Sequence, residues 1–187
     1  MKKPGHSAVL NGPVTLTLSR IIIVLPFVIL LMQNNTSCRI AALILFLVAS
    51  ITDHLDGLWA RQSHKVTSLG AFLDPLADKI LINVTFLAFV SLGIVPMWMF
   101  AIILIRDFII DGLRMVAAEK GKVIPALFCG KLKTTFQMIT LISLQLNLIL
   151  QNSIIETCNM VLLYVVVILT TYSGAVYLFR EKRLITK

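Results

Sequence analysis

The chain runs Asp53-His54-Leu55-Asp56-Gly57-Leu58-Trp59-Ala60-Arg61 and, after eight further residues, Gly70-Ala71-Phe72-Leu73-Asp74-Pro75-Leu76-Ala77-Asp78. Four carboxylates therefore stand between two long apolar runs. One acid at the centre of a membrane helix costs roughly 2.5–3.5 kcal/mol, so four unpaired acids would cost on the order of 10 kcal/mol. Divalent cations are the obvious groups to offset that cost.

The spacing of the four aspartates supports a cation site. Asp53 and Asp56 are three residues apart, and Asp74 and Asp78 are four apart, so each pair shares one face if both segments are helical. Two such faces across a tight turn bring like charges together, and these repel unless a cation neutralises them. Carboxylate oxygens suit Mg²⁺, Mn²⁺ or Ca²⁺. The alternative, aspartates on soluble loops, is disfavoured by the apolar flanks.

The composition is that of a membrane protein. The 187 residues are 58% hydrophobic and 14% charged, whereas soluble domains have about 25% charged residues. We expect one all-α integral membrane domain over 1–187, in which 1–14 form a short cytoplasmic or interfacial segment. The polar start predicts no cleavable signal peptide. The three cysteines are widely spaced and predict no disulfide framework.

Six apolar segments predict six transmembrane helices joined by short polar connections. Each segment is long enough to cross a hydrocarbon core of ~30 Å, and short connections make neighbouring helices antiparallel. Tyr164, Tyr172 and Tyr177 are expected to be packing or interfacial residues of the last segment. The segments are 15–32, 39–60, 70–92, 96–118, 132–151 and 158–180.

The positive charges favour one orientation. With six spans, ten basic residues share the side that holds both termini, whereas the other side has only Arg39 at a span edge. The positive-inside rule then places both termini and the aspartate turn in the cytoplasm. The net charge of +8 does not indicate nucleic-acid binding, because no basic stripe with interleaved aromatics is present. The ten residues are Lys2, Lys3, Arg61, Lys65, Lys120, Lys122, Lys131, Lys182, Arg183 and Lys187.

A second polar cluster spans the fourth and fifth apolar segments. Arg106 and Arg114 are eight residues apart and lie near one helix face. Guanidinium forks and nearby ammonium groups suit a phosphate-sized anion. The alternative is intramembrane ion pairing, of Arg106 with Asp107 or Asp111 and of Arg114 with Asp111. The cluster comprises Arg106, Asp107, Asp111, Arg114, Lys131 and Lys133.

The aspartate stretch resembles the signature of the CDP-alcohol phosphotransferase family. Residues 105–114 and 130–138, with 11–13 and 16–20, further resemble one branch, the bacterial phosphatidylglycerophosphate synthases. That branch typically has Glu where this chain has Asp107, and a small residue where it has Asp111. The resemblance covers about Asn11 to Met138. The matching signature positions are Asp53, Asp56, Gly57, Ala60, Arg61, Gly70, Asp74 and Asp78.

The resemblance implies transfer of a phosphatidyl group from CDP-diacylglycerol to the 1-hydroxyl of sn-glycerol 3-phosphate, with release of CMP. It implies two divalent cations, Mg²⁺ or Mn²⁺, held by Asp53, Asp56, Asp74 and Asp78, with Asp78 also taking the hydroxyl proton. It further implies a homodimer in the cytoplasmic membrane, surrounded by membrane lipid. CDP-diacylglycerol would contact Asp53, Asp56, Gly57, Ala60, Arg61, Gly70, Asn11 and Thr17. Glycerol phosphate would contact Arg106, Arg114, Lys131, Lys133 and Thr134.

Two other functions fit parts of the pattern. A related transferase could use inositol phosphate, serine or a phospholipid as the acceptor. A cation transporter could use the aspartates as an ion path, but transport predicts acids spread through the membrane depth on several helices. Four of the nine acids here crowd one hairpin, beside a basic pocket, which favours the transferase.

Overall fold

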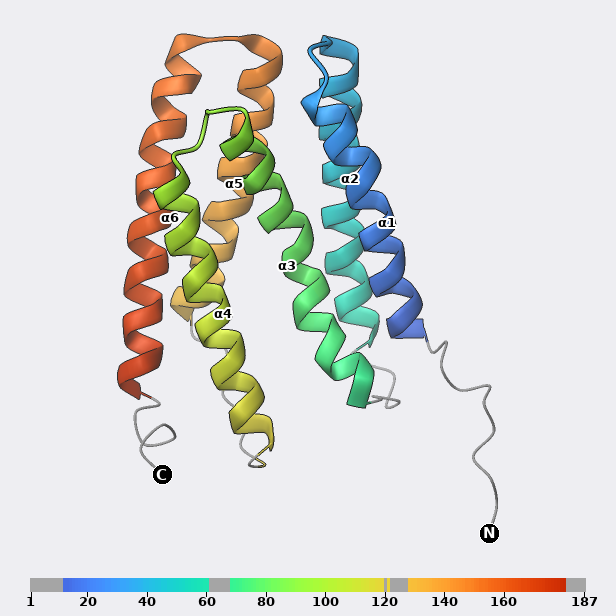
Figure 1. The fold of residues 1–187 in the computed structure, drawn as a ribbon, viewed down its shortest axis with the longest axis vertical. Helices are drawn as coiled ribbons and strands as arrows, with labels where there is room; N and C mark the ends of the chain where they lie inside the picture. Colours follow the sequence, from blue (N-terminus) through green and yellow to red (C-terminus); the bar gives the residue numbers. More distant parts are fainter. Residues whose placement is uncertain (1–11, 61–67, 120, 122–127, 181–187) are drawn as a thin grey trace. The chain divides into compact units, whose positions relative to one another are not determined.

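The chain folds into α-helices throughout the part that its computed structural model describes. These residues are 12–60, 68–119, 121 and 128–180, with side chains described for 22–52, 79–117, 119, 121 and 128–180. The predicted all-α fold with six helices is confirmed (Figure 1). The helices are α1 (Gly12–Met32), α2 (Thr36–Ala60), α3 (Ser68–Ser91), α4 (Met97–Glu119), α5 (Phe128–Leu150) and α6 (Ser153–Arg180).

Two helices, α2 and α6, begin at earlier residues than the apolar segments predict, because a polar side chain caps each of them. The side-chain oxygen of Asn35 accepts a hydrogen bond from the amide of Ser37 at 2.9 Å, so α2 begins at Thr36 rather than at 39. The side-chain oxygen of Asn152 accepts one from the amide of Ile154 at 2.8 Å, so α6 begins at Ser153 rather than at 158. Hydropathy alone does not detect such capped polar turns.

A glycine ends α3 where a break was predicted. Gly93 takes a φ of +72°, which an L side chain rarely adopts. The amides of Gly93 and Ile94 donate back to the carbonyls of Val90 and Phe89, each at 3.0 Å. These bonds satisfy the last carbonyls of α3 and lead the chain into α4.

The chain forms two compact units, Met1–Thr85 and Phe86–Lys187. In the first, α1 packs against α2, and the buried rings of Phe27 and Phe46 lie 5.7 Å apart. In the second, α6 packs against both α5 and α4. Because α5 and α6 are joined by only two residues, they run antiparallel (Figure 1).

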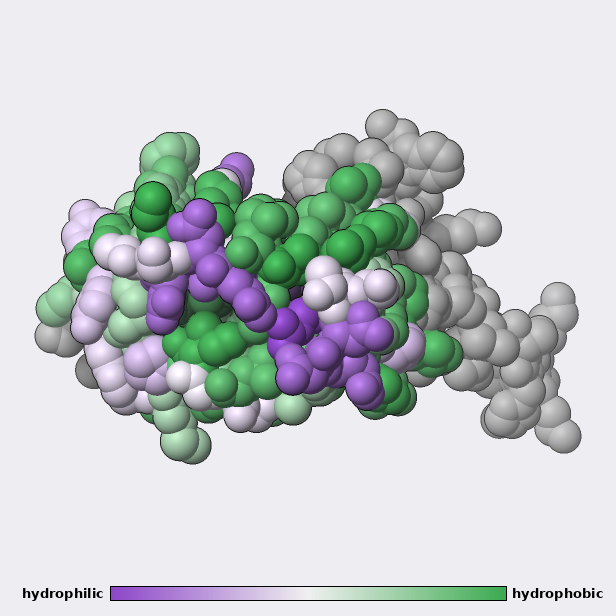
Figure 2. All heavy atoms as spheres, turned by 90° about the horizontal axis from the view of Figure 1, so that it is seen from above, coloured by the Kyte–Doolittle hydropathy of each residue, from purple (hydrophilic) through white to green (hydrophobic). Residues whose placement is uncertain are grey.

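Large apolar side chains face outward on several helices. Ile22 on α1, Phe108 on α4 and Ile168 on α6 are each more than 60% exposed, and Figure 2 shows apolar surface among the described residues. Within the described part, α6 is long and apolar enough to cross a membrane, and shorter apolar stretches occupy 22–32, 36–52 and 79–91. Outward apolar surface of this extent is typical of a protein that contacts lipid.

Candidate active site

The aspartate motif occupies the end of α2 and the start of α3. Asp53 and Asp56 lie in roughly the last two turns of α2, and Asp74 and Asp78 in about the first three turns of α3. Both pairs are therefore on helical backbone, at spacings that put each pair on one face. The side chains of residues 53–78 lie outside the described part, so their convergence remains a prediction.

The other predicted donor-site residues are spread over three helices. Gly57 and Ala60 lie in α2, Gly70 in α3, and Thr17 in α1. Asn11 and Arg61 lie outside the described residues. Among the side chains that the structure does describe, no group of three or more His, Cys, Asp or Glu is placed to hold a metal ion.

The chemistry of the motif fits a divalent cation. Its four donors are carboxylates on the ends of two consecutive helices, and only residues 61–67 separate those helices in the chain. Hard oxygen donors of this kind are the ligands that Mg²⁺ and Mn²⁺ prefer. Pro75 lies inside α3, about two turns from its start.

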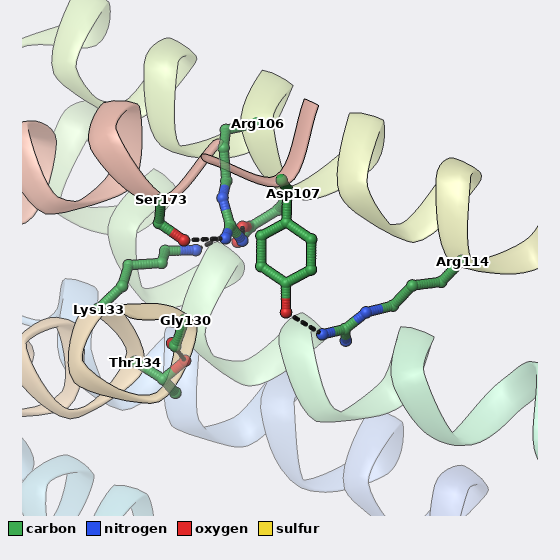
Figure 3. Close-up of polar contacts among 8 residues, drawn as sticks. Arg106, Asp107, Arg114, Gly130, Lys133, Thr134 and Ser173 are labelled. Atoms are coloured by element: carbon green, nitrogen blue, oxygen red, sulfur yellow. Dashed lines mark hydrogen bonds and ion pairs between the residues drawn. The ribbon is translucent and has the colours of Figure 1, made fainter. Parts of the chain in front are cut away.

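The second predicted cluster is built around a buried carboxylate. Asp107 on α4 is 4% exposed, and its Oδ1 accepts hydrogen bonds from Nη1 of Arg106 at 3.0 Å and from the ammonium group of Lys133 on α5 (Figure 3). The predicted pairing of Arg106 with Asp107 is confirmed. Charged groups so deeply buried are stable only when paired, so Asp107 fixes both cations in place.

Helix α6 holds Arg106 from the other side. Nη2 of Arg106 donates to the hydroxyl of Ser173 at 2.5 Å, and Ser173 is fully buried. The next residue is Gly174, where an added Cβ would lie 3.0 Å from Cγ of Arg106. The arginine side chain therefore runs across α6 at a position where even a methyl group would press against it.

Tyr177 joins the two arginines, which the sequence interpretation missed. Its hydroxyl accepts a hydrogen bond from Nη2 of Arg114 at 2.9 Å. Its ring centroid lies 5.7 Å from Cζ of Arg106 and 5.5 Å from Cζ of Arg114. Tyr177 is 2% exposed, so the expectation that it packs inside the protein is confirmed, whereas its contacts with the two arginines of α4 were not predicted. Its four-residue spacing from Ser173 was the available signal.

The cluster has capacity to bind an anion. The Nε atoms of Arg106 and Arg114 are buried and have no hydrogen-bond partner among the described residues. The printed contacts join three cations, Arg106, Arg114 and Lys133, to one carboxylate, Asp107, and to Tyr177, so these side chains carry an excess of two positive charges. A buried donor without a partner costs about 1–3 kcal/mol, so an anionic ligand would remove that cost.

The structure brings together three of the five residues predicted to bind the acceptor. Arg106, Arg114 and Lys133 meet around Asp107 and Tyr177. Lys131 and Thr134 are exposed on α5, and the Thr134 hydroxyl donates to the carbonyl of Gly130 at 3.1 Å. The described contacts therefore do not join these two residues to the cluster.

Comparison with known proteins decides the family. The sequence pattern of the CDP-alcohol phosphatidyltransferases matches residues 10–172, which include the aspartate motif and the basic residues of α4 and α5. The chain belongs to this family. As a CDP-alcohol phosphatidyltransferase it is an enzyme of phospholipid biosynthesis, and the family resemblance of its sequence is confirmed.

Named relatives of this CDP-alcohol phosphatidyltransferase share about a third of its residues. The CDP-diacylglycerol–glycerol-3-phosphate 3-phosphatidyltransferase of Bacillus subtilis is 37% identical over 149 residues, which cover 73% of this chain and 77% of the relative. The protein of the same name from Escherichia coli K12 is 36% identical, and the match covers 90% of this chain and 93% of the relative. A probable phosphatidylglycerophosphate synthase of Mycobacterium tuberculosis H37Rv is 34% identical, and the match covers 96% of this chain and 85% of the relative.

Proposed function

We propose that this chain transfers the phosphatidyl group of CDP-diacylglycerol to the 1-hydroxyl of sn-glycerol 3-phosphate, giving phosphatidylglycerophosphate and CMP. The buried basic cluster carries the proposal. A phosphomonoester carries about 1.5 to 2 negative charges near neutral pH, which matches the excess of two positive charges that Arg106, Arg114 and Lys133 have over Asp107. A neutral acceptor such as serine would not require two arginines with unpaired Nε donors. The names of the relatives agree with this acceptor.

In the proposed reaction the 1-hydroxyl oxygen of the acceptor attacks the phosphorus of the phosphatidyl group. The bond from that phosphorus to the CMP oxygen breaks, CMP leaves with the electron pair, and the Asp78 carboxylate takes the hydroxyl proton. Arg106, Arg114 and Lys133 hold the acceptor phosphate through charge-assisted hydrogen bonds. Lys131 and Thr134 are proposed at the entrance to this pocket, since both are exposed.

The donor is proposed to lie at the aspartate motif. Asp53, Asp56, Asp74 and Asp78 would hold two Mg²⁺ or Mn²⁺ ions, which when bound neutralise charge on the diphosphate. The cytidine and diphosphate would lie against small residues that admit a close approach, with Arg61 near phosphate. The proposed donor contacts beyond the aspartates are Asn11, Thr17, Gly57, Ala60, Arg61 and Gly70.

We propose that all six helices cross the cytoplasmic membrane, with both termini and the active site on the cytoplasmic side, and that the enzyme is a homodimer. The shortest helix has 21 residues, which is enough for a core of about 30 Å. Exposed apolar side chains on α1, α4 and α6 support contact with lipid. A lipid donor accounts for a transferase in this location.

A purified-enzyme assay tests the proposal. The protein is mixed with CDP-diacylglycerol and, separately, with glycerol 3-phosphate, serine, inositol phosphate or phosphatidylglycerol. CMP release is measured and the lipid product is identified by mass spectrometry. Of these acceptors, we expect only glycerol 3-phosphate to give CMP release, with phosphatidylglycerophosphate as the lipid product. A product from serine instead would assign another acceptor, and cation flux in vesicles without CMP release would indicate a transporter.

A further inference from the structure

Tyr177 lies where three helices of the second unit meet. Tyr177 is on α6, and its hydroxyl accepts a hydrogen bond from Arg114 of α4. Its ring centroid lies within 6 Å of the guanidinium carbons of both Arg106 and Arg114. Its other neighbour is Gly130 of α5, where an added Cβ would lie 3.8 Å from both Cε2 and the hydroxyl of the tyrosine. The ring thus links the two arginines and borders the start of α5.

Two cations on one helix face repel each other unless something separates them. The face of an aromatic ring carries negative potential and attracts cations within about 6 Å of its centroid. A single ring that contacts both Arg106 and Arg114 therefore lowers their repulsion before any anion binds. The hydrogen bond to the tyrosine hydroxyl further restricts the direction of Arg114.

The two arginines differ in how else they are held. Arg106 is also fixed by Asp107 and Ser173, at 3.0 and 2.5 Å. For Arg114, the hydrogen bond that the described residues show is the one to Tyr177. The position of Arg114 therefore depends on Tyr177 more strongly than that of Arg106 does.

We propose that Tyr177 is a positioning residue that sets the separation of Arg106 and Arg114, and that this separation selects an acceptor carrying a phosphomonoester group. The inference rests on the proposed function and deepens it. Tyr177 does not contact the reacting atoms. It holds the two guanidinium groups in the arrangement that the acceptor phosphate requires. The free-energy cost of ordering these side chains is therefore not added to the cost of binding the acceptor.

The test compares three variants in steady-state kinetics, with each substrate varied in turn. Tyr177→Phe keeps the ring and removes the hydrogen bond, and Tyr177→Leu removes both interactions. Tyr172→Leu is the matched control, because Tyr172 lies on the same helix and is 58% exposed. We expect the KM for glycerol 3-phosphate to rise severalfold in Tyr177→Phe and on the order of tenfold in Tyr177→Leu, as expected for loss of about 1.4 kcal/mol of binding. The KM for CDP-diacylglycerol should change less than twofold in both.

The control should resemble the wild-type enzyme in both Michaelis constants. A merely structural role predicts a lower kcat with both Michaelis constants unchanged, and that result would overturn the inference. If Tyr177→Leu does not fold, Tyr177→Phe decides, since it changes one hydroxyl. If the wild-type enzyme makes phosphatidylglycerophosphate but the KM values of the variants are unchanged, the inference about Tyr177 is refuted and the proposed function is not. Wild-type enzyme that does not use glycerol 3-phosphate refutes the proposed function as well.

Discussion

Lys133 on α5 and Asp107 on α4 form a buried ion pair, in which the two residues are 2% and 4% exposed. Asp107 also pairs with Arg106, so one carboxylate serves two cations. The two members of the Lys133–Asp107 pair are therefore not equivalent. Removing the lysine leaves Asp107 with Arg106, whereas removing the carboxylate takes this anionic partner from both the buried Lys133 and the mostly buried Arg106.

The first prediction follows from this asymmetry. Asp107→Asn should lower the free energy of unfolding by about 3–5 kcal/mol, the usual cost of breaking a buried pair. Lys133→Met should cost less, because Asp107 keeps Arg106. Unfolding in mixed micelles measures both. The double variant Asp107→Asn with Lys133→Met should lose less than the sum of the single losses. Equal losses from the two single variants would contradict the asymmetry.

The second prediction concerns two glycines that border the cluster. At Gly174 an added Cβ would lie 3.0 Å from Cγ of Arg106, whereas at Gly130 the nearest atoms would be 3.8 Å away. Gly174→Ala should therefore displace Arg106 and raise the KM for glycerol 3-phosphate severalfold. Gly130→Ala should leave this KM within about twofold and stabilise the helix by roughly 0.5–1 kcal/mol.

These two substitutions control for each other, because both exchange glycine for alanine inside a helix beside the same cluster. Kinetics and unfolding of each variant are measured under the same conditions. If Gly174→Ala leaves the KM for glycerol 3-phosphate at the wild-type value, Arg106 can move aside without loss of function. A strong effect of Gly130→Ala would show that the space between α5 and Tyr177 is tighter than 3.8 Å implies.

Much of the fold could be predicted from the sequence because hydropathy and chain breakers act locally. The ends of α1, α2 and α6 at residues 32, 60 and 180 agree with the predicted segments. The start of α6 was missed, because Ser153 and Glu156 are polar and their helix depends on the Asn152 cap. A cap is a contact made by one side chain, and hydropathy averaged over many residues does not detect it.

In the candidate site, too, some residues could be predicted from the sequence and others could not. The charged residues of α4 and α5 stood out because charges are rare in apolar segments. Ser173, Gly174 and Tyr177 did not, because such residues are common in packed membrane helices. Their role depends on which face of α6 meets α4, and that is a tertiary contact. The same holds for the choice of Asp107 as the partner of Arg106.

The third prediction concerns metal removal. Since the proposed donor site has four carboxylates, a chelator should abolish CMP release, and Mg²⁺ or Mn²⁺ should restore it. Asp78→Asn should abolish turnover but keep CDP-diacylglycerol binding measurable, because it removes the proton acceptor. Asp56→Asn should weaken both binding and turnover. Full turnover in excess chelator would exclude the proposed ions, and near-normal turnover of Asp78→Asn would reject that residue as the base.

The last prediction concerns orientation in the membrane, and it uses the caps to choose the labelling sites. Asn35 and Asn152 hold the first turns of α2 and α6, so replacing either would cost about 1 kcal/mol. Thr36 and Ser153 are exposed neighbours whose replacement by cysteine leaves the caps intact. Lys65 and Lys122 are the matching positions in the connections expected on the cytoplasmic side.

Each cysteine is introduced alone, after the native thiols Cys38, Cys129 and Cys158 are replaced, since all three are free. In sealed vesicles of known orientation, a membrane-impermeant maleimide should reach Lys65→Cys and Lys122→Cys only from the cytoplasmic side. It should reach Thr36→Cys and Ser153→Cys only from the opposite side. This pattern is required because basic residues stay with the cytoplasm, where soluble glycerol 3-phosphate enters and CMP leaves. The reverse pattern would place the aspartate turn away from both molecules and would refute the proposed orientation of the active site.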